Sequence, residues 1–190
     1  TTFQHVNFIK DCIEGVLSQK TTFPIEYLIG EDFSTDGTRE IVFEYAKKYP
    51  DIIRVITADY NMHKYKGNSR RLKLNARGKY IAICEGDDCW TDLYKLQKQV
   101  DFLETHPDYG LIHTELDHYY VKIGKLVKNH WETSNVREQE GDLYVNFMKG
   151  KNSMIYYCTA CYRNDLINNN ADFDKVLQQN FLIGDTTMSL

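Results

Sequence analysis

The chain has 190 residues, of which 42% are hydrophobic and 26% are charged, and its formal net charge at pH 7 is −4. This length and composition are typical of one soluble globular domain with a sizeable core. An acidic net charge supplies no broad positive field, so nucleic acid is not expected as a partner. No segment approaches the roughly 18 apolar residues of a membrane-spanning helix. The five cysteines are odd in number, which favours reduced thiols over a disulfide framework.

The first ninety residues alternate between helix and strand patterns. Apolar residues recur at helical spacing in three segments: residues 5–19, Glu40–Lys48 and Arg71–Ala76. Short apolar runs that are typical of buried strands occur in three others: Ile25–Ile29, Ile52–Ile56 and Tyr80–Cys84. Residues 57–70 are expected to form a polar loop. This alternation predicts a parallel sheet covered by helices. The chain opens where a first strand would end, so we expect a piece of a longer protein, truncated at both ends.

The second half is less regular. Helices are predicted in three segments: Asp92–Thr105, Asp142–Met148 and, as a single turn, Arg163–Ile167. Strands are predicted over Tyr109–Ile123 and Met154–Tyr162, and Gly124-Lys125 is expected to turn a hairpin back through Val127. A polar loop is expected over residues 129–141. The sequence therefore predicts an α/β fold with a mostly parallel sheet and a smaller mixed or antiparallel C-terminal part.

Carboxylates gather directly after two of the predicted strands. One group is Glu31 and Asp32, and the other is Glu85, Asp87 and Asp88. Because parallel strands open at the same sheet edge, both groups are predicted to line one ligand-binding crevice. Three acids within four positions repel one another, and a divalent Mg²⁺ or Mn²⁺ shared with substrate phosphates would neutralise them. A solvated acidic turn that caps the next helix is the alternative interpretation.

The acids belong to two longer motifs. Residues 32–38 read Asp-Phe-Ser-Thr-Asp-Gly-Thr, and residues 78–92 read Gly-Lys-Tyr-Ile-Ala-Ile-Cys-Glu-Gly-Asp-Asp-Cys-Trp-Thr-Asp. Together with Lys95-Leu-Gln-Lys-Gln-Val100, they resemble the motifs of family 2 glycosyltransferases of the GT-A fold, bacterial members in particular. The resemblance covers residues 1–110 closely and extends more loosely to Asp185. It implies that residues 1–110 form a nucleotide-sugar-binding half and residues 111–190 an acceptor-side half of one domain.

The same resemblance implies an activity. Such enzymes transfer a hexosyl or N-acetylhexosaminyl group from a nucleotide-sugar, usually a UDP-sugar, to an acceptor hydroxyl with inversion. A divalent ion, Mn²⁺ or Mg²⁺, stabilises the diphosphate leaving group. The implied process is bacterial surface polysaccharide synthesis with a glycan or lipid-linked acceptor. The implied location is the cytoplasm, at the inner face of the cell membrane, with any peripheral membrane association made by regions outside this sequence.

The resemblance also implies roles for individual residues. Asp87 and Asp88 would hold the metal, and Asp185 would act as the catalytic base that takes the acceptor proton. A loop aspartate that caps a helix is the alternative for Asp185. Asp32 would accept the imide N–H of uracil. The residues implied to bind the nucleotide are Thr1, Phe3, Glu31, Asp32, Arg70, Arg71, Glu85 and Asp87.

Three positions depart from the family pattern. Glu85 stands where aspartate is commoner, and Phe3-Gln4 replaces Tyr-Asn, so metal geometry and base stacking are expected to differ. Two alternatives to a glycosyltransferase remain at this stage: a catalytically silent nucleotide-binding module of the same fold, and a sugar nucleotidyltransferase. The second would normally carry a glycine-rich phosphate loop after its first strand, which residues 1–7 lack.

Overall fold

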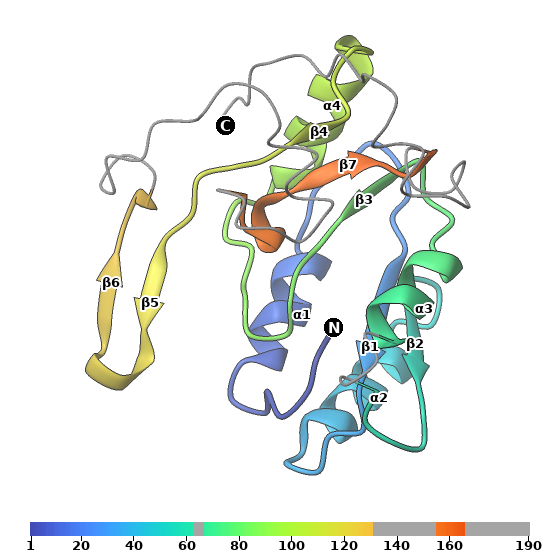
Figure 1. Cartoon of the computed structure of the whole chain (residues 1–190), viewed down its shortest axis with the longest axis vertical. Helices are drawn as coiled ribbons and strands as arrows, with labels where there is room; N and C mark the ends of the chain where they lie inside the picture. The colour runs from blue at the N-terminus through green and yellow to red at the C-terminus, as the bar shows by residue number, and fades with distance from the viewer. Residues whose placement is uncertain (63–66, 131–154, 166–190) are drawn as a thin grey trace. The chain divides into compact units, whose positions relative to one another are not determined.

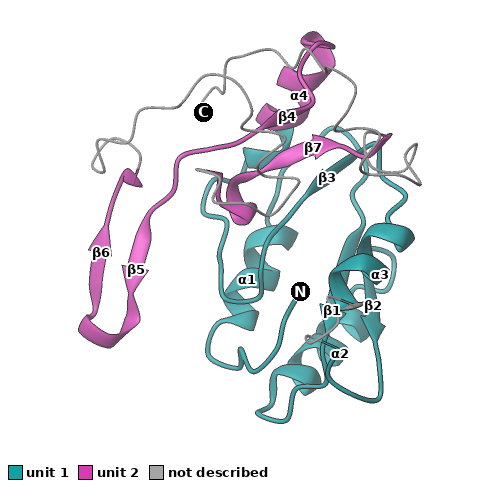
Figure 2. Cartoon of the chain, viewed as in Figure 1, with its two compact units in different colours: residues 1–97 teal, residues 98–190 magenta. Residues whose placement is uncertain are grey.

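A computed structural model describes residues 1–62, 67–130 and 155–165 of the chain (Figure 1). The chain divides into two compact units, Thr1–Gln97 and Lys98–Leu190 (Figure 2). The division into a nucleotide-sugar-binding half and an acceptor-side half at residue 110 remains a prediction. Within the described residues, no helix combines the length and the apolar composition that crossing a membrane requires.

The first unit is built on a parallel pair of strands, β1 (Tyr27–Glu31) and β2 (Ile53–Thr57). Tyr27 lies opposite Ile53, and Glu31 lies opposite Thr57. Thr2 forms a parallel bridge with Glu31, so the N-terminal residues run beside the end of β1. The parallel pairing predicted for these two strands is confirmed, although each strand is shifted by one or two residues toward its C-terminal end.

Three helices pack on this pair: α1 (Ile9–Leu17), α2 (Thr38–Lys48) and α3 (Gly67–Asn75). Helices α2 and α3 contact both strands, and α1 contacts α2. The apolar stripe predicted for α1 is buried, as helical spacing requires. Each buried aliphatic side chain contributes about 1.5–3 kcal/mol, so this core carries much of the unit's stability. The central cluster comprises Ile9, Ile13, Ile29, Val42 and Ile53.

Two elements of the first unit differ from the prediction. Helix α3 begins at Gly67, inside the expected polar loop, because Asn68 and Leu72 pack closely against Gly30 of β1 and tertiary contacts outweigh weak apolar periodicity. Strand β3 covers only Tyr80–Ala82 and is half-buried, whereas a buried strand was predicted as far as Cys84. Cys84 and the residues after it leave the strand and contact α1 instead.

The second unit contains short antiparallel pairs, as the sequence predicted for the C-terminal part. Helix α4 (Lys95–Thr105) leads into it from the first unit, and β4 (Leu111–Ile112) pairs with β7 (Cys161–Arg163). Strands β5 (His118–Tyr120) and β6 (Lys125–Val127) form the predicted hairpin. Its turn is wider than expected.

The hairpin turn consists of the 3-10 segment η2 (Val121–Ile123) and Gly124, whose φ of 60° lies in the left-handed region that favours glycine. The single strand predicted over Tyr109–Ile123 is therefore wrong, because the chain forms two short strands and this turn.

The last described segment also differs from the prediction. The 3-10 segment η3 (Tyr157–Thr159) precedes β7, where a continuous strand was expected, and Arg163 lies in β7 rather than in a helical turn. The Arg163 side chain explains its position, because its guanidinium donates hydrogen bonds to the main-chain carbonyl oxygens of Tyr109 and Leu103. The helix predicted over Asp142–Met148 lies outside the described residues.

Candidate functional site

The N-terminal segment connects the two acidic groups. The main chain of Thr2 donates to the carbonyl oxygen of Gly30 at 2.9 Å and accepts from the N–H of Asp32 at 3.1 Å. The carbonyl oxygen of Thr1 accepts a hydrogen bond from the N–H of Gly86 at 2.9 Å. Residues 1 and 2 are therefore hydrogen-bonded both to the C-terminal end of β1 and to the turn that carries Glu85, Asp87 and Asp88.

The acidic turn approaches this segment too closely for any residue but glycine at position 86. A Cβ atom there would lie 2.4 Å from Oγ1 of Thr2 and 2.7 Å from Nδ1 of His5. The turn is closed by a hydrogen bond of 2.9 Å from the N–H of Asp88 to the carbonyl oxygen of Glu85. Gly86 thus allows the turn and the N-terminal segment to pack directly together.

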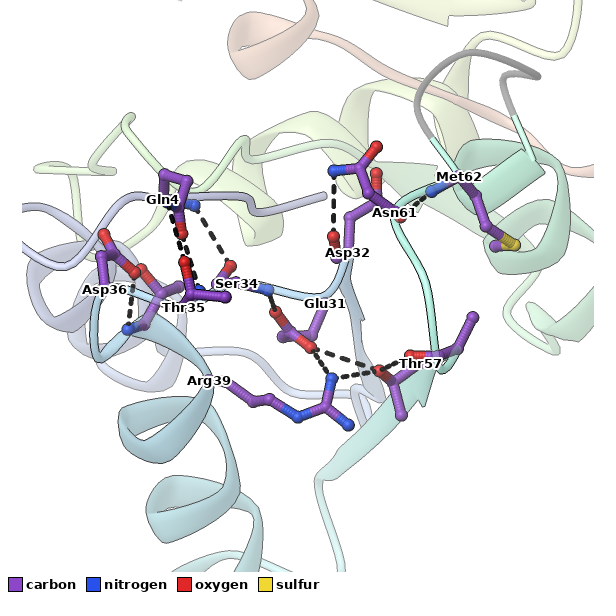
Figure 3. A network of polar contacts seen from close by, with 12 residues as sticks. Gln4, Glu31, Asp32, Ser34, Thr35, Asp36, Arg39, Thr57, Asn61 and Met62 are labelled. Carbon is purple, nitrogen blue, oxygen red and sulfur yellow. Dashed lines mark hydrogen bonds and ion pairs between the residues drawn. The ribbon is translucent and has the colours of Figure 1, made fainter.

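Asp32 lies at the end of β1 and is 94% buried, with 6% of its surface exposed. Its Oδ1 accepts a hydrogen bond of 2.8 Å from the main-chain N–H of Met62, and its carbonyl oxygen accepts one of 3.1 Å from the Asn61 side chain (Figure 3). The segment that follows β2 therefore fixes the Asp32 carboxylate at the sheet edge.

Glu31 has no exposed surface and lies inside a polar network that joins β1, β2 and α2 (Figure 3). Its carboxylate forms an ion pair with Arg39, accepts a hydrogen bond of 2.6 Å from the N–H of Ser34, and accepts one of 3.2 Å from the Thr57 hydroxyl. Arg39 also donates to Thr57 at 2.9 Å. These contacts give Glu31 a structural role, and its contact with a nucleotide stays a prediction.

The turn between β1 and α2 holds the N-terminal segment through its polar side chains. Gln4 accepts from the N–H of Thr35 at 2.8 Å, and the N–H of Gln4 donates to the Ser34 hydroxyl at 3.1 Å. Gln4 replaces the asparagine of the family pattern and has a φ of 56°. Its side chain and backbone therefore dock the segment onto the turn.

Asp36 makes the second attachment. Its Oδ1 accepts from the N–H of Thr38 and its Oδ2 from the N–H of Val6, both at 3.0 Å. Burial raises the pKa of Asp36, but the hydrogen bonds from Thr38 and Val6 outweigh burial and lower the pKa below its usual value. The Thr38 hydroxyl accepts from the N–H of His5 at 2.8 Å. The Ser, Asp and Thr of this motif thus position residues 4–6, a role that the sequence did not reveal.

Helix α1 supports the acidic turn from another side. The thiol of Cys12 donates to the carbonyl oxygen of Glu85 at 3.2 Å, and the thiol of Cys89 donates to that of Asp11 at 3.4 Å. A Cβ atom at Gly15 would lie 2.9 Å from the carbonyl oxygen of Trp90, so the helix and the turn pack backbone to backbone. No pattern in the sequence indicated these contacts.

Asp87 is the most accessible carboxylate of the acidic turn, with 54% of its side chain exposed. Its Oδ2 lies 3.9 Å from Nε2 of His5. In the part of the chain that the structure describes, no three His, Cys, Asp or Glu side chains are arranged to hold a metal ion. Mg²⁺ commonly takes one or two carboxylates and completes its shell with water and substrate phosphates. The oxygen donors of Asp87 and Asp88 fit such a shared ion better than a closed protein cage.

The remaining candidates lie around these groups. Arg71 of α3 is half-buried, and its guanidinium lies 3.8 Å from the sulfur of Met62, the residue that fixes Asp32. Arg70 is exposed, Phe3 is 43% exposed, and Thr1 is half-buried. Asp185 lies outside the described residues.

The chain is similar to several bacterial proteins. A Mycobacterium tuberculosis protein of uncharacterized function is 41% identical over 107 residues, or 56% of this chain. The putative teichuronic acid biosynthesis glycosyltransferase TuaG of Bacillus subtilis is 34% identical over 51% of it. The Escherichia coli UDP-Glc:alpha-D-GlcNAc-diphosphoundecaprenol beta-1,3-glucosyltransferase WfaP is 37% identical over 49% of it. The matches span 31%, 37% and 35% of these relatives' own lengths, respectively.

Solved structures share the fold. Staphylococcus aureus TarS in complex with UDP-GlcNAc superposes with a TM-score of 0.63 at 22% identity, covering 89% of this chain and 45% of TarS. The mannosyltransferase PcManGT of Pyrobaculum calidifontis, in complex with GDP-Man and Mn²⁺, gives 0.64 at 19% identity, covering 90% and 44%. The α/β fold is the GT-A fold that the sequence predicted.

The family comparison extends beyond the two acidic motifs. Residues 1–169 match the family described as Glycosyl transferase family 2. The match includes the N-terminal segment, both acidic groups, α3 and the antiparallel pairs of the second unit. The chain belongs to glycosyltransferase family 2.

Proposed function

We propose that this chain binds the donor in an inverting glycosyltransferase that moves a hexosyl or N-acetylhexosaminyl group from a UDP-sugar to an acceptor hydroxyl. The observation that carries the proposal is the N-terminal segment, whose Thr1 and Thr2 hydrogen-bond to the strand end at Asp32 and to the acidic turn at Gly86. A nucleoside diphosphate needs a hydrogen-bond acceptor for its base and a cation for its phosphates, and these two groups supply both.

Each side chain has a proposed task. The buried Asp32 accepts the N–H of the base, since its Oδ2 has no hydrogen-bond partner within the described residues. Asp87 and Asp88 would hold Mn²⁺ or Mg²⁺, and such an ion would supply the positive charge that a diphosphate leaving group needs. Other contacts to the nucleotide come from Thr1, Phe3, Glu31, Glu85 and the two arginines Arg70 and Arg71.

Asp185 is the proposed base for the acceptor. A single displacement at the anomeric carbon requires a carboxylate that takes the proton of the attacking hydroxyl, and this step inverts the configuration. Asp185 lies outside the described residues and after the matched residues 1–169, so its role rests on the resemblance in sequence alone. A chain with Asp185→Asn is expected to keep UDP binding and to lose transfer.

The acceptor and the process are inferred from the relatives. TuaG is named for teichuronic acid biosynthesis and WfaP for a diphosphoundecaprenol-linked acceptor. Both names support polysaccharide synthesis on a glycan or lipid-linked acceptor. The location proposed with this process is the cytoplasmic face of a membrane. The family match favours this function over a sugar nucleotidyltransferase.

Calorimetric titration of UDP into the chain, with Mn²⁺ and with EDTA, tests the proposal. We expect binding that requires the metal and that Asp87→Ala abolishes. Asp51→Ala is the matched control, because Asp51 is an exposed aspartate that precedes β2. Equal binding by both variants, or binding unchanged by EDTA, would show that the acidic turn does not hold a metal-bound diphosphate. Binding of UDP without transfer of a sugar would favour the silent module.

A further inference from the structure

Two thiols from distant parts of the chain lie side by side next to the acidic turn. Cys12 belongs to α1, and Cys84 lies between the end of β3 and Glu85. Their sulfur atoms are 3.7 Å apart, and neither cysteine belongs to a disulfide. The two positions are 72 residues apart, so only the fold brings them together.

The environments of the two sulfurs differ in a way that matters for their chemistry. Cys12 has no exposed surface, whereas Cys84 is half-buried and is therefore the more accessible of the two residues. A disulfide has a sulfur–sulfur bond of about 2.05 Å, so the two atoms would have to approach by about 1.6 Å. Cys84 lies outside β3, so its main chain can shift without breaking a strand ladder.

We propose that Cys12 and Cys84 are an oxidation site, at which a hydroperoxide converts the two thiols into an intramolecular disulfide. The Cys84 sulfur attacks one peroxide oxygen, the O–O bond breaks, and Cys84 becomes a sulfenic acid while water is released. The Cys12 sulfur then attacks the Cys84 sulfur, the S–O bond breaks, and the hydroxyl leaves as a second water with the Cys12 proton. In total, two thiols and one hydrogen peroxide give one disulfide and two waters.

The disulfide would change the acidic turn. In the reduced chain, the Cys12 thiol donates a hydrogen bond of 3.2 Å to the carbonyl oxygen of Glu85. Oxidation removes that proton and draws Cys84 toward α1, so Glu85 loses a contact and its main chain moves. This consequence rests on the proposed function: a displaced turn holds Asp87 away from its place, and UDP with Mn²⁺ binds at least tenfold more weakly.

Peptide mapping of the whole chain tests the oxidation site. The reduced chain is treated with stoichiometric hydrogen peroxide, free thiols are alkylated, and proteolytic peptides are compared with and without reductant. We expect a linked pair of peptides that contain Cys12 and Cys84, a mass about 2 Da below the two separate peptides, and reversal by dithiothreitol. Links between other cysteines, or peroxide consumption that leaves both thiols free to alkylate, would overturn the proposal.

Two variants sharpen the test. Cys84→Ser is expected to abolish the link, and its half-buried position makes it easier to tolerate than a change at the buried Cys12. Cys89→Ser is the matched control, because Cys89 is an exposed thiol in the same turn and is expected to leave the link intact. A link that persists in Cys84→Ser would overturn the assignment.

Titration of UDP and Mn²⁺ before and after oxidation separates the two proposals. Weaker binding that dithiothreitol restores supports the coupling to the acidic turn. A linked chain that binds UDP as before refutes the coupling and leaves the disulfide established. A reduced chain that binds no UDP contradicts the proposed function, while the peptide map still decides the oxidation site.

Discussion

Replacing Arg39 by methionine tests the structural role of Glu31 at the end of β1. The substitution keeps much of the aliphatic length and removes the charge that faces a carboxylate with no exposed surface. Breaking a buried ion pair by removing one partner costs about 3–5 kcal/mol. Glu31 keeps its hydrogen bonds from Ser34 and Thr57, and Arg39 has 27% of its side chain exposed. We therefore expect Arg39→Met to lower the free energy of unfolding by about 3 kcal/mol, the lower end of this range.

A loss of this size lowers the melting temperature by about 6–12 °C for a domain of this length. Thermal and urea unfolding of Arg39→Met measure it. Arg54→Met is the matched control, because Arg54 pairs at 2.9 Å with Glu26, which Arg77 also contacts at 2.9 Å, so Glu26 keeps a partner. Because Glu26 keeps Arg77 as a partner and is 19% exposed, whereas Glu31 is fully buried, the control is expected to cost less than about 1 kcal/mol. If both variants unfolded at the same temperature, Glu31 would not depend on Arg39, and its carboxylate would be available to a ligand.

Three further predictions concern the same unit. Gly86→Ala is expected to displace the acidic turn from Thr2 and to lower both the melting temperature and the affinity for UDP. Scanning calorimetry measures the first and titration calorimetry the second. Hydrogen bonds lower the pKa of folded Asp36 below the ordinary value of an aspartate, so the stability they add is present above that ordinary value and is lost as pH falls through the folded pKa. Asp36→Ala should therefore be less stable than the parent at neutral pH, and the difference should shrink in acid-unfolding curves. A hydrogen bond to Glu14 raises the pKa of Tyr45 to about 12, and Glu14→Gln should return its NMR titration toward 10.

The fold could be predicted where one physical signal dominates. The stripe of α1 and the apolar runs of β1 and β2 are strong because each element buries one face in a common core. Strand β3 was predicted too long, because the apolar Ile83 and Cys84 continue the strand pattern while Cys84 turns toward α1. The pattern of apolar residues predicts which side chains are buried, but it does not predict which neighbouring element each of them packs against.

The candidate site, like the fold, could be predicted only in part. Its acids could be found from sequence, because both groups follow apolar runs that are typical of strands. The single sheet edge expected for them is not seen in the described residues, where β1 and β3 lie in different sheets and hydrogen bonds of Thr1 and Thr2 connect the two groups. What each acid does could not be found, since that depends on long-range partners. Glu31 and Asp32 are adjacent in sequence, yet the Glu31 carboxylate is enclosed by Arg39 and Ser34, whereas the Asp32 carboxylate accepts a hydrogen bond from the main-chain N–H of Met62.

The N-terminal segment explains why the two acidic groups depend on each other. Residues 1–6 belong to no helix or strand, so their position comes from hydrogen bonds to neighbours: Gln4 to Thr35, and Val6 to Asp36. The same turn that follows Asp32 therefore anchors the segment onto which Gly86 packs. A change in the Asp36 turn should consequently reach the acidic turn through the N-terminal segment, although the two turns are fifty residues apart in sequence. The D-x-S-x-D-G-T motif therefore has two roles. It supplies Asp32 at the end of β1, and its other polar residues hold the N-terminal segment against which the acidic turn packs.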